Sequence, residues 1–205
     1  RGYWLVTWFC RQYAVEEDFP QLLNEMNEKA KNIPPGSNGL FVFPFWAPHY
    51  VLYPDAKGAI IGWTDAHTKE YLYRAILESI AYALRNGFEI IQKNIKNKTE
   101  EIYIVGGGSK SDVAMQLTAD IFKIKTIRLQ THEVCAVGAA IAAGVGSGVF
   151  KDEKDGIEKM IKIDREFEPI LENSKIYDDI YENIYKKFYK VNKPITNVLS
   201  KYEYV

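Results

Sequence analysis

Residues 102–112 read Ile-Tyr-Ile-Val-Gly-Gly-Gly-Ser-Lys-Ser-Asp, an apolar strand that runs directly into three glycines. A helix is expected to begin soon after this turn. Glycine accepts a positive φ and carries no Cβ, so ligand atoms can approach the backbone of Gly106, Gly107 and Gly108. The helix directs its free N–H groups and the positive end of its dipole toward that space. The stretch therefore predicts a phosphate site, or a platform for the sugar or base of a nucleotide.

The glycine run by itself does not identify a ligand. It matches neither the Gly-x-Gly-x-x-Gly dinucleotide pattern nor the Gly-Lys-Ser/Thr ending of a P-loop, so neither kind of chemistry is indicated. A strand-to-helix turn that binds nothing stays open as an alternative. Ser111 or Asp112 is expected to cap the following helix rather than to act in catalysis. Lys110 is expected to be exposed.

Strand and helix patterns alternate on both sides of this stretch. Short apolar runs predict strands at 40–43, 59–63, 101–105 and 126–129, and helical spacing predicts helices at 19–32, 68–96, 111–122, 136–147 and 175–191. The run at 4–9 is too short to assign to either type. Thr68 can cap the long helix. The alternation between residues 40 and 150 indicates α/β layering, with helices covering a sheet.

Two of these helices carry distinctive faces. The helix at 136–147 consists largely of Gly and Ala, and such small side chains suit a core helix that lies close to its neighbour. The helix at 175–191 carries isoleucines and tyrosines in two adjacent stripes, which form one broad amphipathic face. We expect this face to pack on the body of the domain rather than to bind a ligand.

The composition narrows the class of protein. The chain has 205 residues, of which 47% are hydrophobic and 26% charged, with a formal net charge of -1. It can therefore bury a core, and no attraction to nucleic acid or to an anionic membrane is expected. Cys10 and Cys135 lie among apolar neighbours, so buried free thiols in a reducing cytoplasm are expected. The sequence shows no membrane span and no secretory leader, and its opening within an apolar run indicates a cut end.

The acidic and histidine residues indicate structural roles rather than a metal site. His49, His67 and His132 do not pair with Cys or with another His at metal-ligand spacing, so structural or exposed positions are expected. Asp65 suits a cap or turn before the long helix. Glu78, inside that helix, suits packing or an ion pair.

The order of several segments resembles one known family. Residues 58–64, Gly-Ala-Ile-Ile-Gly-Trp-Thr, followed by Leu-Tyr-Arg-Ala-Ile-Leu-Glu-Ser-Ile-Ala at 72–81, resemble the second signature of FGGY carbohydrate kinases. Trp63 and Tyr71 depart from that signature. The turn at 106–111 looks like the adenosine motif of this family. Residues 133–140, Glu-Val-Cys-Ala-Val-Gly-Ala-Ala, look like its acidic start of a Gly-Ala-Ala helix, and the tail is similar to those of xylulokinase-like members.

The resemblance implies an α/β fold, a ribonuclease-H-like or actin-like ATPase domain with a central sheet flanked by helices. It implies a C-terminal nucleotide-binding domain at 1–165 and a helical extension at 166–205 packed on the same domain. The backbone of Gly106, Gly107 and Gly108, together with Ser111, is then expected to border the adenosine of ATP.

The same resemblance places the chemistry outside this chain. Members of the family use an aspartate to deprotonate a sugar hydroxyl, which attacks the γ-phosphate of Mg-ATP, and positioning with charge neutralisation carries most such catalysis. That aspartate, the phosphate loops and most of the sugar pocket belong to an N-terminal domain. No catalytic residue and no metal ligand is therefore assigned here, and Mg2+ is expected to be held mainly by the nucleotide and that domain.

The expected partners are the protein's own N-terminal kinase domain and a small sugar or polyol, with a homodimer left open and no nucleic acid or membrane. The leading function is half of an ATP-dependent sugar kinase, inactive by itself. The alternatives are a non-catalytic, actin-like nucleotide-binding regulator and a domain that serves only as an interaction module.

Overall fold

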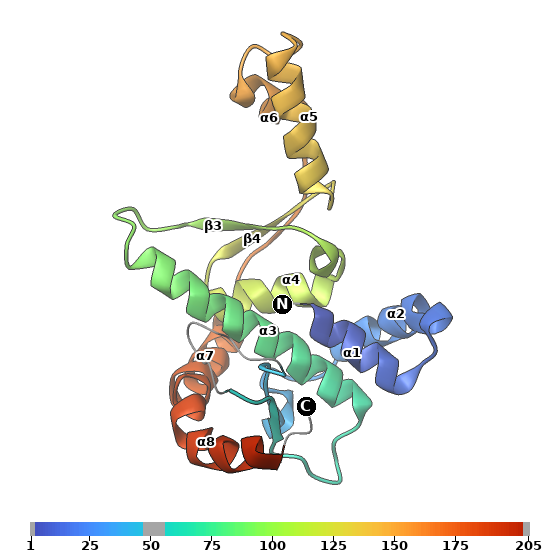
Figure 1. Ribbon diagram of the computed structural model, residues 1–205, viewed down its shortest axis with the longest axis vertical. Coiled ribbons are helices and arrows are strands. Elements are labelled where there is room, and N and C mark those ends of the chain that lie inside the picture. Colours follow the sequence, from blue (N-terminus) through green and yellow to red (C-terminus); the bar gives the residue numbers. More distant parts are fainter. Residues whose placement is uncertain (1–2, 47–55, 203–205) are drawn as a thin grey trace.

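The computed structural model describes residues 3–46 and 56–202 and has a mixed α/β architecture (Figure 1). In chain order, its main elements are α1 (Trp4–Tyr13), α2 (Phe19–Ala30), β1 (Phe41–Phe43), β2 (Ala59–Ile61), α3 (Lys69–Gln92), β3 (Glu101–Ile104), α4 (Asp112–Phe122), β4 (Lys125–Leu129), α5 (Val134–Gly146), α6 (Glu153–Met160), β5 (Ile163–Phe167), α7 (Leu171–Ile180) and α8 (Lys186–Leu199). The run at 4–9, which the sequence leaves unassigned, is therefore helical.

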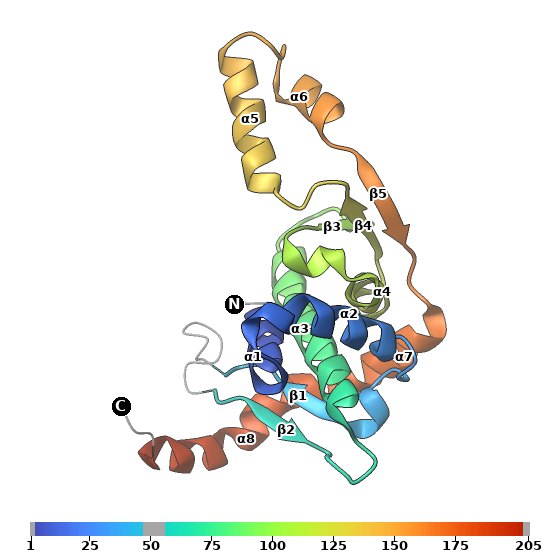
Figure 2. The ribbon, with the colours of Figure 1, turned by 90° about the vertical axis from the view of Figure 1, so that its right-hand side faces the viewer.

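The strands form two small sheets. β1 pairs with β2 in an antiparallel hairpin. In the other sheet, β4 lies between β3, which it pairs in parallel, and β5, which it pairs antiparallel. The helices α3 and α4 pack on each other and lie to one side of this sheet (Figures 1 and 2). The expected α/β class is confirmed, and β5 adds a strand that the sequence does not predict.

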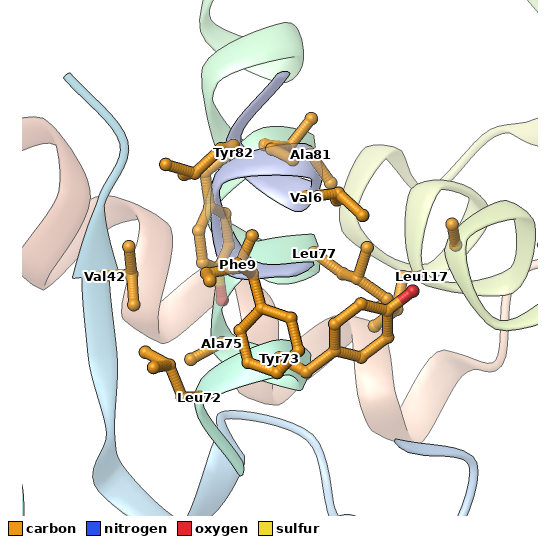
Figure 3. Close-up of a cluster of buried hydrophobic side chains, with 14 of the residues drawn as sticks. Val6, Phe9, Val42, Leu72, Tyr73, Ala75, Leu77, Ala81, Tyr82 and Leu117 are labelled. Atoms are coloured by element: carbon orange, nitrogen blue, oxygen red, sulfur yellow. The ribbon is translucent and has the colours of Figure 1, made fainter. Parts of the chain in front are cut away.

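Helix α3 forms the centre of the core. Its predicted apolar face is buried along most of its length, with Leu72, Ile76 and Ile80 each at most 4% exposed. The face packs on α1, β1 and α4, and Figure 3 shows Val42 of β1 and Leu117 of α4 on opposite sides, with Phe9 of α1 between them. The helix ends at Gln92, a few residues before the predicted end.

Thr68 occupies the N-cap position of α3, as predicted, but its side chain makes no cap hydrogen bond. Its hydroxyl instead donates to the Glu70 carboxylate. A Ser or Thr cap usually stabilises a helix start by accepting hydrogen bonds from the first backbone N–H groups. Here the Glu70 carboxylate in the first turn can stabilise it instead, through its interaction with the helix dipole.

A buried ion pair joins α3 to two other parts of the chain, the turn at residues 36–37 and α7. The Arg74 Nε lies 3.0 Å from the Glu78 Oε1, and both side chains are less than a tenth exposed. Glu78 also accepts hydrogen bonds from the Gly36 N–H at 3.1 Å and from the Ser37 and Tyr177 hydroxyls at 3.0 and 2.9 Å. Burial raises the pKa of the Glu78 carboxyl, and the Arg74 guanidinium opposes that shift. The expected ion-pair role of Glu78 is confirmed.

The C-terminal helices pack on α3 through tyrosines. Tyr177, Tyr181 and Tyr185 are at most 1% exposed, and their rings surround that of Tyr82 at centroid distances of 5.8 to 6.2 Å. A π-helical segment, Tyr181–Tyr185, joins α7 to α8 and keeps these rings on one side. The prediction that the tail helix packs on the body of the domain is confirmed. The β5 strand runs across positions 165 and 166, where the sequence analysis divides the chain.

The prediction of a core helix at 136–147 is wrong. Helix α5 extends away from the body together with α6 (Figures 1 and 2), and the described part of the chain buries only Ile141 of this helix. The prediction for the cysteines is half right, because Cys10 is buried whereas Cys135, on α5, is exposed. Small residues indicate that a neighbour lies close, but they do not say whether that neighbour belongs to this stretch of chain.

We predict that Glu78→Ala lowers the free energy of unfolding by about 3–5 kcal/mol, because it leaves the Arg74 guanidinium buried without its partner. Denaturant titration measures this change. The matched control is Glu25→Ala, since the Glu25–Lys29 pair has the same i,i+4 spacing but is nearly half exposed; it should change stability very little. The double variant Arg74→Met with Glu78→Leu should be more stable than Glu78→Ala, because no charge stays buried without a partner. It should be less stable than the wild type, because Gly36, Ser37 and Tyr177 lose their acceptor. A double variant as unstable as Glu78→Ala would contradict this account.

Candidate functional site

The glycine turn lies between the end of β3 and the start of α4. Gly106 has φ 85° and ψ -170°, a conformation that favours glycine. A short 3-10 turn, Gly107–Lys110, follows and is closed by the Ser109 N–H and hydroxyl, which both donate to the Gly106 carbonyl, at 3.2 and 2.8 Å. The predicted turn is therefore present, and hydrogen bonds within it hold its shape.

The three glycines have different surroundings. A Cβ added to Gly106 or to Gly107 would meet no atom within 4 Å, so the backbone faces open space at both positions. A Cβ on Gly108 would lie 2.1 Å from the ring of Tyr3. The first two glycines thus keep the platform accessible, whereas Gly108 is required for packing against α1. A sequence run of three glycines gives no sign of this division.

Ser111 caps α4, as expected, and is held in place by a residue that the sequence analysis does not single out. Its hydroxyl oxygen accepts a hydrogen bond from the Ala114 N–H at 3.3 Å and donates to the Asn27 Oδ1 at 2.6 Å. Asn27, on α2, also accepts a hydrogen bond from the Tyr73 hydroxyl of α3 at 2.9 Å. The Ser111 hydroxyl thus donates its proton to Asn27, and its oxygen can take part in other hydrogen bonds only as an acceptor.

The charges beside the turn are paired. Asp112, in the first turn of α4, binds Arg128 at 2.6 Å and Arg165 at 2.7 Å. Arg128 also donates to the Ser109 carbonyl at 3.3 Å and to Asp164 at 2.6 Å. A carboxylate at a helix start already interacts with the positive end of the helix dipole. Lys110 is exposed, as expected.

The described histidines make structural contacts, as expected. His132 lies with its Nδ1 2.9 Å from the Ser109 Oγ, so it joins the glycine turn to the loop before α5. The two ring nitrogens of His67 lie 3.0 Å from the Thr64 N–H and 3.2 Å from the Asn38 carbonyl. Asp65 lies in a turn before α3, as expected. His49 lies outside the described residues.

Within residues 3–46 and 56–202, no three His, Cys, Asp or Glu side chains come together in a way that could hold a metal ion. In the same part of the chain, no helix has both the length and the apolar character needed to cross a membrane.

Comparison with known proteins gives a consistent picture. Residues 2–147 match the model of the FGGY family of carbohydrate kinases, C-terminal domain. The chain is 33% identical over 172 residues to the xylulose kinase of Bacillus subtilis, covering 83% of this chain and 34% of that protein. It is 36% identical over 155 residues to glycerol kinase 2 of Thermotoga maritima, covering 74% of this chain and 30% of that protein.

The crystal structure of a xylulose kinase from Lactobacillus acidophilus has the same fold. It superposes with a TM-score of 0.77 at 22% sequence identity, covering 97% of this chain and 39% of that chain. The fold is therefore that of the C-terminal part of FGGY sugar kinases. The chain spans about a third of the length of the curated relatives that it matches.

We predict that Gly108→Ala lowers the free energy of unfolding by about 1–3 kcal/mol, because the new Cβ overpacks against Tyr3. Gly107→Ala should change stability by no more than about 0.5 kcal/mol, since its Cβ would face open space. The double variant Tyr3→Ala with Gly108→Ala should lose less unfolding free energy than the sum of the losses in the two single variants. Denaturant titration of the wild type, the two single variants and the double variant measures this difference. Equal losses in the two glycine variants would show that Tyr3 does not pack on Gly108.

Proposed function

The chain belongs to the FGGY family of carbohydrate kinases, whose C-terminal domain it carries, and on this premise we propose that it is the nucleotide-binding half of an ATP-dependent kinase. The complete enzyme transfers the γ-phosphate of ATP to a hydroxyl of a sugar or polyol. The observation that carries this proposal is the open backbone at Gly106 and Gly107, directly before the capped start of α4.

The glycine turn suits the adenosine of ATP better than its phosphates. The Asp112 carboxylate already occupies the positive end of the α4 dipole and binds Arg128 and Arg165, so neither the helix start nor these two arginines are free to bind a phosphate. The open glycines, in contrast, leave a flat approach for an uncharged sugar or base. We therefore assign the backbone of Gly106 and Gly107 to direct contact with adenosine, and Gly108 and Ser111 to the border of the platform.

Ser111 adds a specific recognition element to this platform. Because its hydroxyl proton is donated to Asn27, its oxygen can only accept a further hydrogen bond. A nucleoside offers suitable donors in the ribose hydroxyls and in the adenine amino group. Asn27 is a positioning residue in this proposal, since it acts through Ser111.

In the proposed enzyme, the two domains have different roles in the reaction. This domain binds and orients the nucleotide, while the aspartate base and the phosphate loops lie in the N-terminal domain. Mg2+, held by the nucleotide and that domain, would neutralise charge on the phosphates. The relatives include both xylulose kinases and glycerol kinases, so the substrate class is a sugar or polyol. A cytoplasmic location fits the two free cysteines.

We propose that the exposed face of α5 packs on the N-terminal domain. The helix is apolar, its small side chains allow close approach, and the relatives are about three times as long as this chain. His132 joins Ser109 of the glycine turn to the loop that leads into α5, so the proposed nucleotide platform is linked to the start of this helix through that loop. In the same scheme, residues 1–165 form the nucleotide-binding domain and 166–205 the extension that packs on it.

The proposed activity requires both domains. In an assay that couples ADP formation to NADH oxidation, the full-length protein should phosphorylate at least one member of a panel of sugars and polyols. The 205-residue chain alone should show no turnover, because it lacks the base. Turnover by this chain alone would contradict the division of labour, and a full-length protein inactive on every member would favour a nucleotide-binding regulator.

Gly107→Trp is expected to abolish adenine nucleotide binding, because the indole would occupy the open face of the turn. Calorimetry or NMR titration with ADP measures the effect, and the wild-type chain should bind weakly. The control is Gly87→Trp in α3, where a Cβ likewise meets no atom within 4 Å; it should bind ADP as the wild type does. Unchanged binding by Gly107→Trp would mean that the turn is only structural.

The contact of α5 can be followed through Cys135. Its thiol is exposed in this chain and should react readily with a thiol reagent, whereas in the full-length protein it should react at least tenfold more slowly. Cys10, which is buried in this chain, should react slowly in both proteins and serves as the internal control. Equal reactivity of Cys135 in the two proteins would mean that the N-terminal domain does not cover this part of α5.

A further inference from the structure

The C-terminal half of α8 and the turn that follows it carry a row of exposed apolar side chains. Each of the five is between 52% and 74% exposed: Val191, Ile195, Val198, Leu199 and Tyr202. Four of them, at positions 191, 195, 198 and 202, recur at alternating steps of four and three residues. Such steps place side chains in one narrow row along a helix. We call these five residues the α8 stripe.

The α8 stripe continues a row that begins in the core. Phe188 precedes Val191 by three residues, and its ring lies 4.9 Å from the Phe43 ring and 5.5 Å from the Phe41 ring, both of β1. Beyond Phe188, α8 extends past the β1–β2 hairpin to the edge of the molecule (Figure 2). The row that is covered by β1 at Phe188 is therefore exposed to solvent from Val191 onward.

The polar side of α8 is basic. Four lysines and no acidic residue lie within Lys186–Leu199, and Lys201 follows just beyond its end. Lys187 lies one turn before Val191, and Lys201 lies one turn after Val198, so these two lysines flank the α8 stripe. The whole chain has a formal net charge of -1, so positive charge is concentrated on this helix.

The shape of the α8 stripe favours a helix over a lipid surface as its occupant. Helices that lie in a membrane interface carry residues such as Trp, Phe and Leu on their apolar face. The α8 stripe is narrow, and three of its members are Val or Ile, whose χ1 angles are stiff. A row with steps of three and four residues is the seam along which two helices pack.

Charge and position argue against two nearer occupants. A second copy of α8 would bring the lysines that flank the two stripes together, and like charges across an interface are unfavourable. The N-terminal domain, in the arrangement proposed above, covers α5, which lies at the opposite end of the long axis of the molecule from α8 (Figure 1). A helix of another protein fits better, provided that acidic side chains flank its apolar row.

We propose that the α8 stripe is a docking surface for an amphipathic helix of another protein, whose apolar row is flanked by Asp and Glu. The apolar row packs against Val191, Ile195 and Val198, and the flanking carboxylates pair with Lys187 and Lys201. Exposed ion pairs contribute little affinity, so apolar burial supplies most of it and the charges select the partner. The glycine turn takes no part, so the proposal does not depend on nucleotide binding.

Two synthetic peptides test this proposal. Both form about five turns of helix, with leucine at every position of the apolar row, and they differ only in carrying Glu or Lys beside that row. Fluorescence anisotropy should show that the Glu peptide binds the 205-residue chain at least tenfold more tightly than the Lys peptide. Added salt should reduce this difference, because the flanking charges are exposed. Equal binding of the two peptides would overturn the proposal.

Substitutions on α8 locate the site. Ile195→Asp should abolish binding of the Glu peptide without unfolding the chain, because the side chain is exposed. The matched control is Val149→Asp, at an exposed apolar position between α5 and α6, and it should bind as the wild type does. The double variant Lys187→Glu with Lys201→Glu should prefer the Lys peptide. Circular dichroism checks that each variant is folded. Wild-type binding by Ile195→Asp, or an unchanged preference in the double variant, would contradict the proposal.

Three further results would overturn the proposal in favour of another occupant. Sedimentation of the chain with vesicles of phosphatidylcholine and phosphatidylserine in equal parts, lost in Ile195→Asp, would identify a lipid surface. A dimer in size-exclusion chromatography with light scattering, lost in the same variant, would identify a second copy. Failure of the full-length protein to bind the Glu peptide that this chain binds would show that its own N-terminal domain covers the α8 stripe.

Discussion

The buried carboxylate of Glu78 is the constraint on which the rest of the domain depends. An ionised side chain within a core is tolerated only where opposite charge and hydrogen bonds compensate for the lost water. Here the compensation comes from Arg74 one turn earlier, from the turn at Gly36 and Ser37, and from Tyr177 of α7. These groups belong to separate parts of the chain. The carboxylate is fully hydrogen-bonded only when the turn before β1, α3 and α7 are packed together as they are here.

The geometry of the glycine turn follows from this arrangement. Once α3 is fixed, the Tyr73 hydroxyl holds Asn27 of α2, and Asn27 holds Ser111 at the start of α4. The turn is bounded on its other side by Tyr3 of α1, whose ring occupies the space beside Gly108. The open backbone at Gly106 and Gly107 is therefore positioned by α1, α2 and α3, although the proposed nucleotide platform lies in the turn itself. A loss of packing between α2 and α3 would therefore displace Asn27, and with it Ser111 at the border of the proposed nucleotide platform.

Local patterns predict those features whose causes are local. The periodicity of α3, the cap at Ser111 and the strand β3 that leads into Gly106 are all set by residues a few positions apart, and the structure contains each of them. The strand β5 was missed because most of its residues are exposed and polar, so it shows neither an apolar run nor alternation.

Features that depend on residues far apart in the chain could not be predicted from local sequence patterns. The roles of Asn27 and of Tyr3 become visible only when α1, α2 and the glycine turn are brought together. The small residues of α5 predict a core helix, yet the described residues bury only Ile141 of that helix. The proposal that another domain packs there accounts for its exposure, for the exposed position of Cys135 and for the length of the relatives.

The central claim is that the turn at Gly106 and Gly107 receives a nucleoside rather than a phosphate. The most direct measurement is a pair of NMR titrations that follow the backbone amide signals of the turn, one with adenosine and one with pyrophosphate. The account predicts that adenosine shifts the signals of Gly106 and Gly107, while pyrophosphate at equal concentration leaves them in place. Shifts caused by pyrophosphate alone, or by neither compound, would contradict it.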